Sequence, residues 1–286
     1  MRQIPLYDIN GEFAPKTVDS AISPDIDSSY IRINYSGVRI QVKTDNYCGI
    51  KQWGSRASSQ QGMAVYEDML VSFSNGGSHY IYLIGNNGTL SQVATFTLAT
   101  GHSNALQFSP ILESGQFVPY LYVSDANGKC YVVSIAPDYT ASIVQTITVG
   151  GGQVLIGDDG YIWTSERNGT ISRRIFKKYR RVSVSEGDVT LTTDDVLDEF
   201  DTDKIYSTSD VTAQGWSVKY GKIWFCYGQS GDGQKRGVDV YDTATHRRLT
   251  ELDFTNYTSL ELEDVDFYNN VMLVSTYSTT IFEVRF

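Results

Sequence analysis

Short runs of apolar residues, separated by turn residues, follow one another from about residue 60 to the end of the sequence. Each repeat holds up to four such runs, and the first repeat has them at 62–65, 69–72, 80–84 and 93–98. Runs of this length that are rich in Val, Ile, Tyr and Thr are typical of strands in a half-buried sheet. The pattern therefore predicts an all-β protein.

One polar residue stands at the threshold of the same strand pattern in every repeat. These residues are Gln61, His102, Gln153, Gln214 and Glu263. Successive members are 41, 51, 61 and 49 positions apart. A repeat of this size in an all-strand sequence indicates a propeller, in which each repeat forms one blade. Five repeats predict a five-bladed β-propeller.

The fifth repeat is short, with runs at 265–267, 271–275 and 280–286. A four-stranded blade needs one more strand, because an unpaired edge strand favours aggregation. Alternating runs at 30–34 and 38–42 are spare. We expect one of them to supply the outer strand, so that an N-terminal strand completes the last blade and closes the ring.

Two segments fall outside the repeats. Residues 1–28 contain three prolines and little periodicity, and we interpret them as an N-terminal arm that precedes a propeller over residues 29–286. Residues 185–210 hold nine acids and one lysine. We interpret them as an acidic insertion between the third and fourth blades, with one or two helical turns at 194–200 capped by Thr192 or Thr193.

The recurring polar residues are candidates for a binding site. In a propeller the innermost strand of each blade runs along the central channel, so these five residues are expected to form a ring at one mouth of the channel. Convergent polar side chains in a concavity indicate ligand binding. The alternative is architectural, since such side chains also hold waters or satisfy neighbouring backbone groups. The sequence leaves both interpretations open.

Candidate catalytic groups are sparse. The ring contains one carboxylate, Glu263, whereas glycoside hydrolysis uses two facing carboxylates. Glu261 and Asp264 are close in sequence, but we expect neighbouring strand residues to point to opposite faces. No nucleophile elbow, phosphate loop or dinucleotide fingerprint occurs. We therefore expect no catalytic residues, no cofactor and no enzyme activity; a hydrolase or lyase using His102 with Glu263 is the enzymatic alternative.

Charge and cysteine content narrow the partners. The net charge is −10, and the three cysteines lie far apart without metal-binding spacing, so neither nucleic-acid binding nor a metal site is expected. Residues 173–181 contain six bases and no acid, which suits either the phosphates of an anionic polymer or a solvated blade surface paired with the acidic insertion. No apolar run reaches the ~20 residues of a membrane span. The first residues do not form the apolar core of a secretory signal, so export by that route is not expected.

Several short stretches resemble those of a known group of propellers. They are 61–65 (QGMAV), His102-Ser103-Asn104, 119–124 (PYLYVS) and Glu263-Asp264-Val265. With them, residues 30–286 resemble five-bladed propellers of phage receptor-binding and tail proteins. They are also similar to bacterial propellers annotated after a teichoic-acid biosynthesis protein.

The resemblance implies a non-enzymatic structural or host-recognition component of a bacteriophage tail, located in the virion. Its partners would be other tail proteins or a host-surface glycan, with docking through the N-terminal arm or the acidic insertion. The alternative is a bacterial propeller that binds a glycan or a peptide at the cell surface or in the periplasm, located in the cell envelope or secreted.

Overall fold

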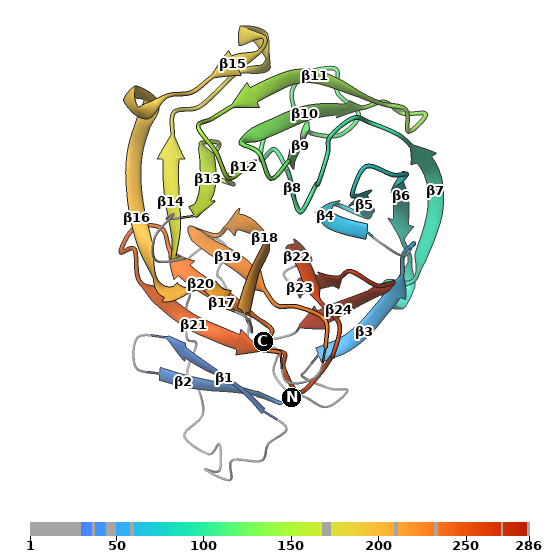
Figure 1. Cartoon of the computed structure of the whole chain (residues 1–286). Helices are drawn as coiled ribbons and strands as arrows, with labels where there is room; N and C mark the ends of the chain where they lie inside the picture. Colours follow the sequence, from blue (N-terminus) through green and yellow to red (C-terminus); the bar gives the residue numbers. More distant parts are fainter. Residues whose placement is uncertain are drawn as a thin grey trace.

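The alternating runs form strands, and the strands form five sheets arranged in a ring around a central axis (Figure 1). The arrangement comes from a computed structural model, which describes residues 30–35, 38–43, 50–57, 60–167, 173–208, 211–231, 234–269 and 271–284. The expected all-β, five-bladed propeller is confirmed. The predicted N-terminal arm over residues 1–28 lies outside the described residues.

Each blade is a four-stranded antiparallel sheet whose strands follow one another from the channel to the rim. Blade 1 contains β4 (Gln60–Tyr66), β5 (Met69–Ser74), β6 (His79–Ile84) and β7 (Leu90–Phe96). Blade 2 contains β8 (Ala105–Phe108), β9 (Leu121–Ser124), β10 (Lys129–Ile135) and β11 (Ala141–Thr148). Blade 3 contains β12 (Gln153–Ile156), β13 (Ile162–Arg167), β14 (Arg173–Tyr179) and β16 (Val196–Ile205).

Blade 4 contains β18 (Val211–Lys219), β19 (Lys222–Tyr227), β20 (Gly237–Asp242) and β21 (Arg248–Asp253). The short strand β17 (Ser207–Thr208) pairs with the start of β18. Blade 5 contains β22 (Leu262–Tyr268), β23 (Val271–Thr276), β24 (Thr280–Val284) and β3 (Ile50–Ser55).

Blade 5 closes the ring, because its outer strand β3 comes from the N-terminal side and pairs antiparallel with β24. Completion of the last blade by an N-terminal strand is therefore confirmed, but both expected runs were the wrong ones. Residues 30–35 and 38–43 form β1 (Tyr30–Tyr35) and β2 (Val38–Lys43), a separate antiparallel hairpin. The sequence of β3, IKQWGS, has no apolar alternation that would have marked it as a strand.

Trp53 fastens the closing strand to blade 1. Its side chain is buried in a cluster that includes Met63 and Leu70 of blade 1 and Ile281 of blade 5. The 3₁₀ turn η1 (Asn86–Gly88) packs on the indole so closely that a Cβ at Gly88 would lie 1.7 Å from the indole Nε1. Glycine is therefore required at this turn, where φ is also +76°.

The hydrophobic core is divided into five clusters, each lying between two adjacent blades. Aromatic pairs show the arrangement. Phe176 of blade 3 contacts Trp216 of blade 4 with ring centroids 5.5 Å apart, and Trp224 of blade 4 contacts Phe267 of blade 5 at 4.9 Å. Because the apolar surface is buried between blades, the channel itself is left to polar groups.

The acidic stretch 185–210 is not an insertion between blades 3 and 4. Its second half is β16, the outer strand of blade 3, in which Phe200 and Thr202 are buried while Asp201 and Asp203 are exposed. This alternation with acids on the solvent side is typical of an edge strand. The expected helical turns reduce to the 3₁₀ turn η3 (Thr193–Asp195), which Thr192 caps as predicted.

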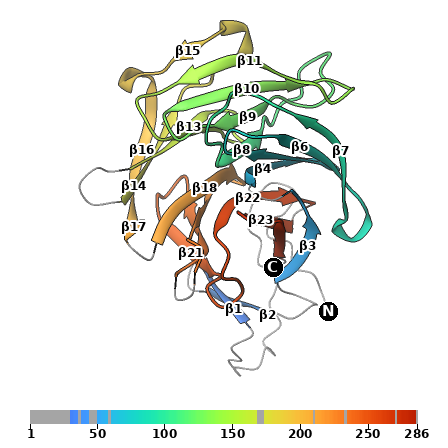
Figure 2. The same ribbon diagram turned by 45° about the vertical axis from the view of Figure 1, so that its right-hand side comes forward.

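The first half of the same stretch connects two blades. After the 3₁₀ turn η2 (Val184–Glu186), strand β15 (Val189–Thr190) pairs in parallel with β11 and adds a fifth strand to blade 2 (Figure 2). Arg180 donates to Glu186 (2.9 Å) and to Asp195 (3.0 Å), so it holds both ends of this crossing. The basic run therefore pairs largely with acids on the blade surface, although Arg174 lies elsewhere, as described below.

Candidate functional site

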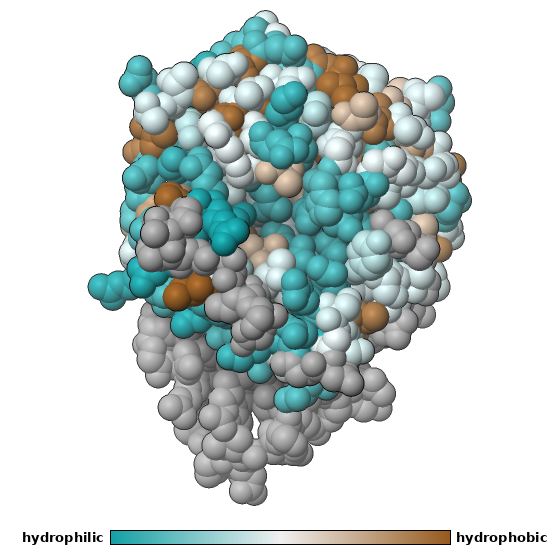
Figure 3. All heavy atoms as spheres, viewed as in Figure 1, coloured by the Kyte–Doolittle hydropathy of each residue, from teal (hydrophilic) through white to brown (hydrophobic). Residues whose placement is uncertain are grey.

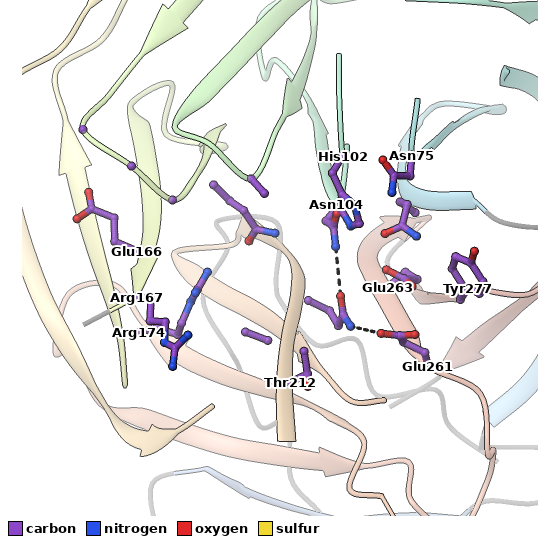
Figure 4. Close-up of a pocket in the computed structure, with 18 residues that line it drawn as sticks. Asn75, His102, Asn104, Glu166, Arg167, Arg174, Thr212, Glu261, Glu263 and Tyr277 are labelled. Atoms are coloured by element: carbon purple, nitrogen blue, oxygen red, sulfur yellow. Dashed lines mark hydrogen bonds between the residues drawn. The ribbon is translucent and has the colours of Figure 1, made fainter. Parts of the chain in front are cut away.

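The five recurring polar residues line one pocket at a mouth of the central channel (Figure 4). Gln61, Gln153, Gln214 and Glu263 belong to the inner strands β4, β12, β18 and β22, and His102 precedes β8. The pocket has a volume of about 910 Å³, and hydrophilic residues gather near the centre of this face (Figure 3). The structure thus brings all five predicted residues together. That they bind a ligand stays a prediction.

β-Bulges aim the ring side chains. The pairing register shifts between Gln60 and Met63 in β4, between Ala213 and Trp216 in β18, and between Leu262 and Asp264 in β22. Each shift falls at the ring position of its blade. A bulge inserts one extra residue, bends the strand and redirects a side chain. The strands therefore present Gln61, Gln214 and Glu263 to the pocket while the residues that follow resume regular pairing.

Below the mouth the inner strands approach one another too closely for side chains at two positions. A Cβ at Gly62 would lie 2.6 Å from the carbonyl oxygen of Ser103, and a Cβ at Gly215 would lie 2.0 Å from that of Asn104. Both glycines directly follow ring residues. Their absence of a side chain allows the blades to meet at the axis and gives the pocket a floor.

In blade 5 the corresponding position is occupied by Asp264, which is fully buried. Its carboxyl group accepts hydrogen bonds from the backbone N–H groups of Met63 (3.0 Å), Leu106 (3.2 Å) and Val265 (2.9 Å). Burial raises the pKa of Asp264 well above its usual value, although these N–H donors act in the opposite direction. Asp264 thus ties the inner strands of blades 1, 2 and 5 together under the pocket.

A chain of hydrogen bonds runs along one side of the pocket. Asn104 Nδ2 donates to Gln214 Oε1 (3.2 Å), and Gln214 Nε2 donates to Glu261 Oε1 (2.5 Å). Glu261 therefore lines the pocket beside Glu263, contrary to the expectation that it would point to another face. The two glutamates are two positions apart, and in a strand such residues share a face. The argument that the ring holds a single carboxylate was wrong.

Glu263 is the most deeply buried of the ring residues, with a side chain 1% exposed. Burial raises its pKa to about 9; the neighbouring Glu261 raises it further and Arg56 opposes the shift. Glu263 is therefore a neutral carboxylic acid at pH 7, able to donate as well as accept a hydrogen bond.

Arg56 lies on the closing segment just after β3 and supports this corner of the pocket. Its guanidinium donates to the carbonyl oxygens of Thr276 (2.6 Å) and Gln60 (3.0 Å) and to Ser72 Oγ (2.7 Å). Burial lowers the pKa of Arg56 to about 10, while Glu263 and Asp264 act in the opposite direction. The arginine stays charged at pH 7 and joins blade 5 to blade 1.

Three buried polar atoms at the pocket make no hydrogen bond to the residues that the structure describes. They are Asn104 Oδ1, Gln153 Oε1 and Glu263 Oε2. Their side chains are 7%, 8% and 1% exposed. A buried polar atom without a partner costs about 1–3 kcal/mol. These atoms are therefore the groups in the pocket that gain most from a polar ligand.

The opposite wall of the pocket belongs to blade 3 and was not foreseen from the sequence. Glu166, Arg167 and Arg174 come from the adjoining ends of β13 and β14 (Figure 4). Beside them Gly152 has φ +80°, and a Cβ there would lie 2.5 Å from the carbonyl oxygen of Ser165. The sequence shows the bases and the glycine run, but only the direction of the strands shows that they reach the same mouth as the ring.

The described residues offer no group of three or more His, Cys, Asp or Glu side chains arranged to hold a metal ion. Burial lowers the pKa of His102 below its usual value, so this side chain is neutral at pH 7. Among the described residues no helix is long and apolar enough to cross a membrane.

The fold and the site define a class: a five-bladed β-propeller with a large polar pocket at one mouth of its channel. No protein-family model and no curated protein sequence matches this chain. In fold it is similar to the glutaminyl cyclase of Myxococcus xanthus, with a TM-score of 0.53 and 12% identity over 82% of this chain and 94% of that one.

A tail fibre of a Staphylococcus aureus phage is similar as well, with a TM-score of 0.50 and 12% identity over 87% of this chain and 53% of that one. The chain thus matches about half the length of the fibre. A gluconolactonase of Xanthomonas campestris has a TM-score of 0.46 and 12% identity, over 91% of this chain and 95% of that one. At such identities the likeness establishes the fold alone.

The prediction that the protein is not an enzyme was wrong. It rested on a resemblance to tail propellers and on a ring with one carboxylate. The fold of this chain is shared with an enzyme, the glutaminyl cyclase of M. xanthus, and the pocket holds three carboxyl groups, those of Glu166, Glu261 and Glu263. A propeller fold supports many functions, so its presence excludes no activity.

Proposed function

We propose that this protein is a saccharide-binding propeller that recognises a host-surface glycan as part of a bacteriophage tail. One observation supports the binding function above all others. Three buried polar atoms without protein partners, on Asn104, Gln153 and Glu263, converge with the amides of the ring in a single pocket. Pockets with convergent polar groups on a preformed scaffold are the usual sites for small ligands.

The chemistry of the lining favours a ligand rich in hydroxyl groups. A hydroxyl both donates and accepts, so it can satisfy the carbonyl oxygens of Asn104 and Gln153 and also accept a hydrogen bond from the neutral acid of Glu263. Tyr277, which is 44% exposed at the rim of the pocket, offers an aromatic face to an apolar side of a sugar ring. The volume of about 910 Å³ lies near the upper end of the range for ligand pockets, which suits more than one sugar unit.

The fold shared with a phage tail fibre is compatible with location in a virion. In that setting the partners would be other tail proteins on one side and a host glycan at the pocket. Docking to the tail would involve the N-terminal arm over residues 1–28 or the acidic crossing around β15. The alternative is a bacterial surface or periplasmic propeller that binds a glycan or a peptide at the same pocket. The genes that flank the coding sequence distinguish the two, since tail and portal genes accompany only the first.

Titration of the purified protein with a panel of saccharides by isothermal calorimetry tests the binding function. Saturable binding is expected. Q214A and E263A should each weaken it at least tenfold, because each removes a hydrogen bond worth about 1.5 kcal/mol or more in a buried site.

Matched controls are Gln92→Ala and Glu113→Ala, which alter exposed residues outside the pocket and should leave binding unchanged. Failure of the whole panel to bind, or equal binding by the pocket variants and the wild type, contradicts the proposal.

A second function is favoured by the pair of glutamates. Glu263 is protonated at neutral pH and Glu261 lies beside it in the same pocket, and two carboxyl groups in different protonation states suit acid–base catalysis. The fold shared with a glutaminyl cyclase makes peptides with an N-terminal glutamine the first substrates to assay. Release of ammonia by the wild type and its loss in E263Q would support this function. The absence of turnover by the wild type on such peptides would exclude that substrate.

A further inference from the structure

Two arginines form one wall of the pocket. Arg167 and Arg174 are directly opposed partners in the antiparallel pair β13–β14, and both line the pocket. Figure 4 shows them together on the side opposite Glu261 and Glu263. Like charges at directly opposed positions of two strands repel one another. This local concentration of positive charge occurs in a protein whose net charge is −10.

The contacts of Arg174 orient its guanidinium without neutralising it. Nε donates to Ser165 Oγ (3.0 Å) and Nη2 donates to the carbonyl oxygen of Ser165 (3.0 Å). The group also lies over the ring of Phe225, 5.5 Å from its centroid. Among the described residues, no carboxylate forms an ion pair with Arg174. The side chain is thus held in place on neutral groups while Nη1 remains available to the pocket.

The carboxylate nearest in sequence serves another base. Glu166 Oε2 accepts from Lys177 Nζ at 2.8 Å, and Glu166 Oε1 accepts from Thr164 Oγ1 at 3.3 Å. The other carboxyl groups of the pocket, those of Glu261 and Glu263, lie on the far wall. Burial lowers the pKa of Arg174 to about 10, so it remains a cation at pH 7 and bears the energetic cost of partial burial without a counter-ion.

We propose that this arginine wall is a subsite for an oxyanion, and that the ligand of the pocket is a saccharide bearing a carboxylate or a phosphate. This rests on the proposed function and specifies its ligand. A planar guanidinium presents parallel N–H groups that match both oxyanions. An anion between Arg167 and Arg174 would also relieve their mutual repulsion. The hydroxyl groups of the same ligand would reach the amides and the neutral acid on the other side.

The test compares matched probes: glucose, glucuronate, glucose 6-phosphate and inorganic phosphate, each titrated into the wild type and three variants. Glucuronate or glucose 6-phosphate should bind at least tenfold more tightly than glucose, and whichever binds more tightly identifies the anion. R174Q should abolish this preference, and R167Q, which changes an exposed side chain, should reduce it if R174Q fails to fold. R181Q is the matched control, because Arg181 contacts Asp159 and Tyr161 outside the pocket, and it should retain the preference.

The outcomes separate this inference from the proposed function. Equal affinity for glucose and the acidic sugars, or a preference that survives R174Q, overturns the oxyanion subsite and leaves saccharide binding standing. Binding of inorganic phosphate that depends on Arg174, with no affinity for any sugar, supports the subsite and contradicts the saccharide function. Absence of binding by all four probes contradicts the subsite.

Discussion

Glu263 is the residue at which the pocket and the stability of the fold are most directly coupled. Its folded-state pKa of about 9 exceeds its ordinary value of 4.5, so its contribution to stability is fully present below about pH 4.5 and is lost as pH rises through about 9. At pH 7 the cost amounts to about 3 kcal/mol.

E263Q, which cannot ionise, should therefore match the wild type near pH 4 and be the more stable protein at pH 8. Urea unfolding at the two pH values measures the difference. Glu261 and Arg56, the other charged groups acting on Glu263, are unchanged in this variant. A difference between the two proteins that does not depend on pH would show that Glu263 is not held neutral in the fold.

At the same scale, the sequence foretold some site residues and not others. The five ring residues could be found because each precedes an inner strand at the spacing of the blades. Glu261 could also have been found, since it is two positions from Glu263 on the same strand face. Arg174 could not, because its place in the pocket depends on which end of β14 faces the channel mouth and on the pairing with Arg167.

Among the elements, the inner strands depend most on Asp264, which accepts backbone hydrogen bonds from residues of β4, β8 and β22. D264A should destabilise the protein by about 3 kcal/mol or more, because it leaves buried N–H donors without acceptors. D264N, which keeps an acceptor oxygen, should cost less. Asp138→Ala, at an exposed turn, is the control. Urea unfolding that shows D264A as stable as the wild type would contradict this role.

Two elements show the limits of reading strands from sequence. The acidic stretch was interpreted as an insertion because its charge masks the alternation of Phe200 and Thr202 with exposed acids in β16. β3 was missed because only Ile50 and Trp53 are strongly apolar in it, and its place was given to runs with clearer alternation. In both cases tertiary pairing, with β14 and with β24, determines the strand, and the local pattern is weak.

For the whole molecule, ring closure is the property on which the fold depends. β3 pairs with β24, Trp53 packs against blade 1, and Arg56 bonds to both blades. Deletion of residues 1–49 should therefore leave a folded propeller, whereas deletion of residues 1–56 should give unfolded or aggregated protein with β24 exposed as an edge. Circular dichroism melting and size-exclusion chromatography compare the two. A cooperative, monomeric unfolding transition in the shorter protein would contradict this account of closure.

The central claim is that the polar mouth of the channel is a ligand-binding site and not only architecture. The most direct test is a crystal structure of the protein soaked with the saccharide that binds most tightly in the titrations. We predict a sugar within hydrogen-bond distance of Gln153, Gln214 and Glu263, with its acidic group against Arg174. The contrary result is a sugar bound elsewhere on the propeller, or a pocket in which ordered waters alone satisfy Asn104 Oδ1, Gln153 Oε1 and Glu263 Oε2.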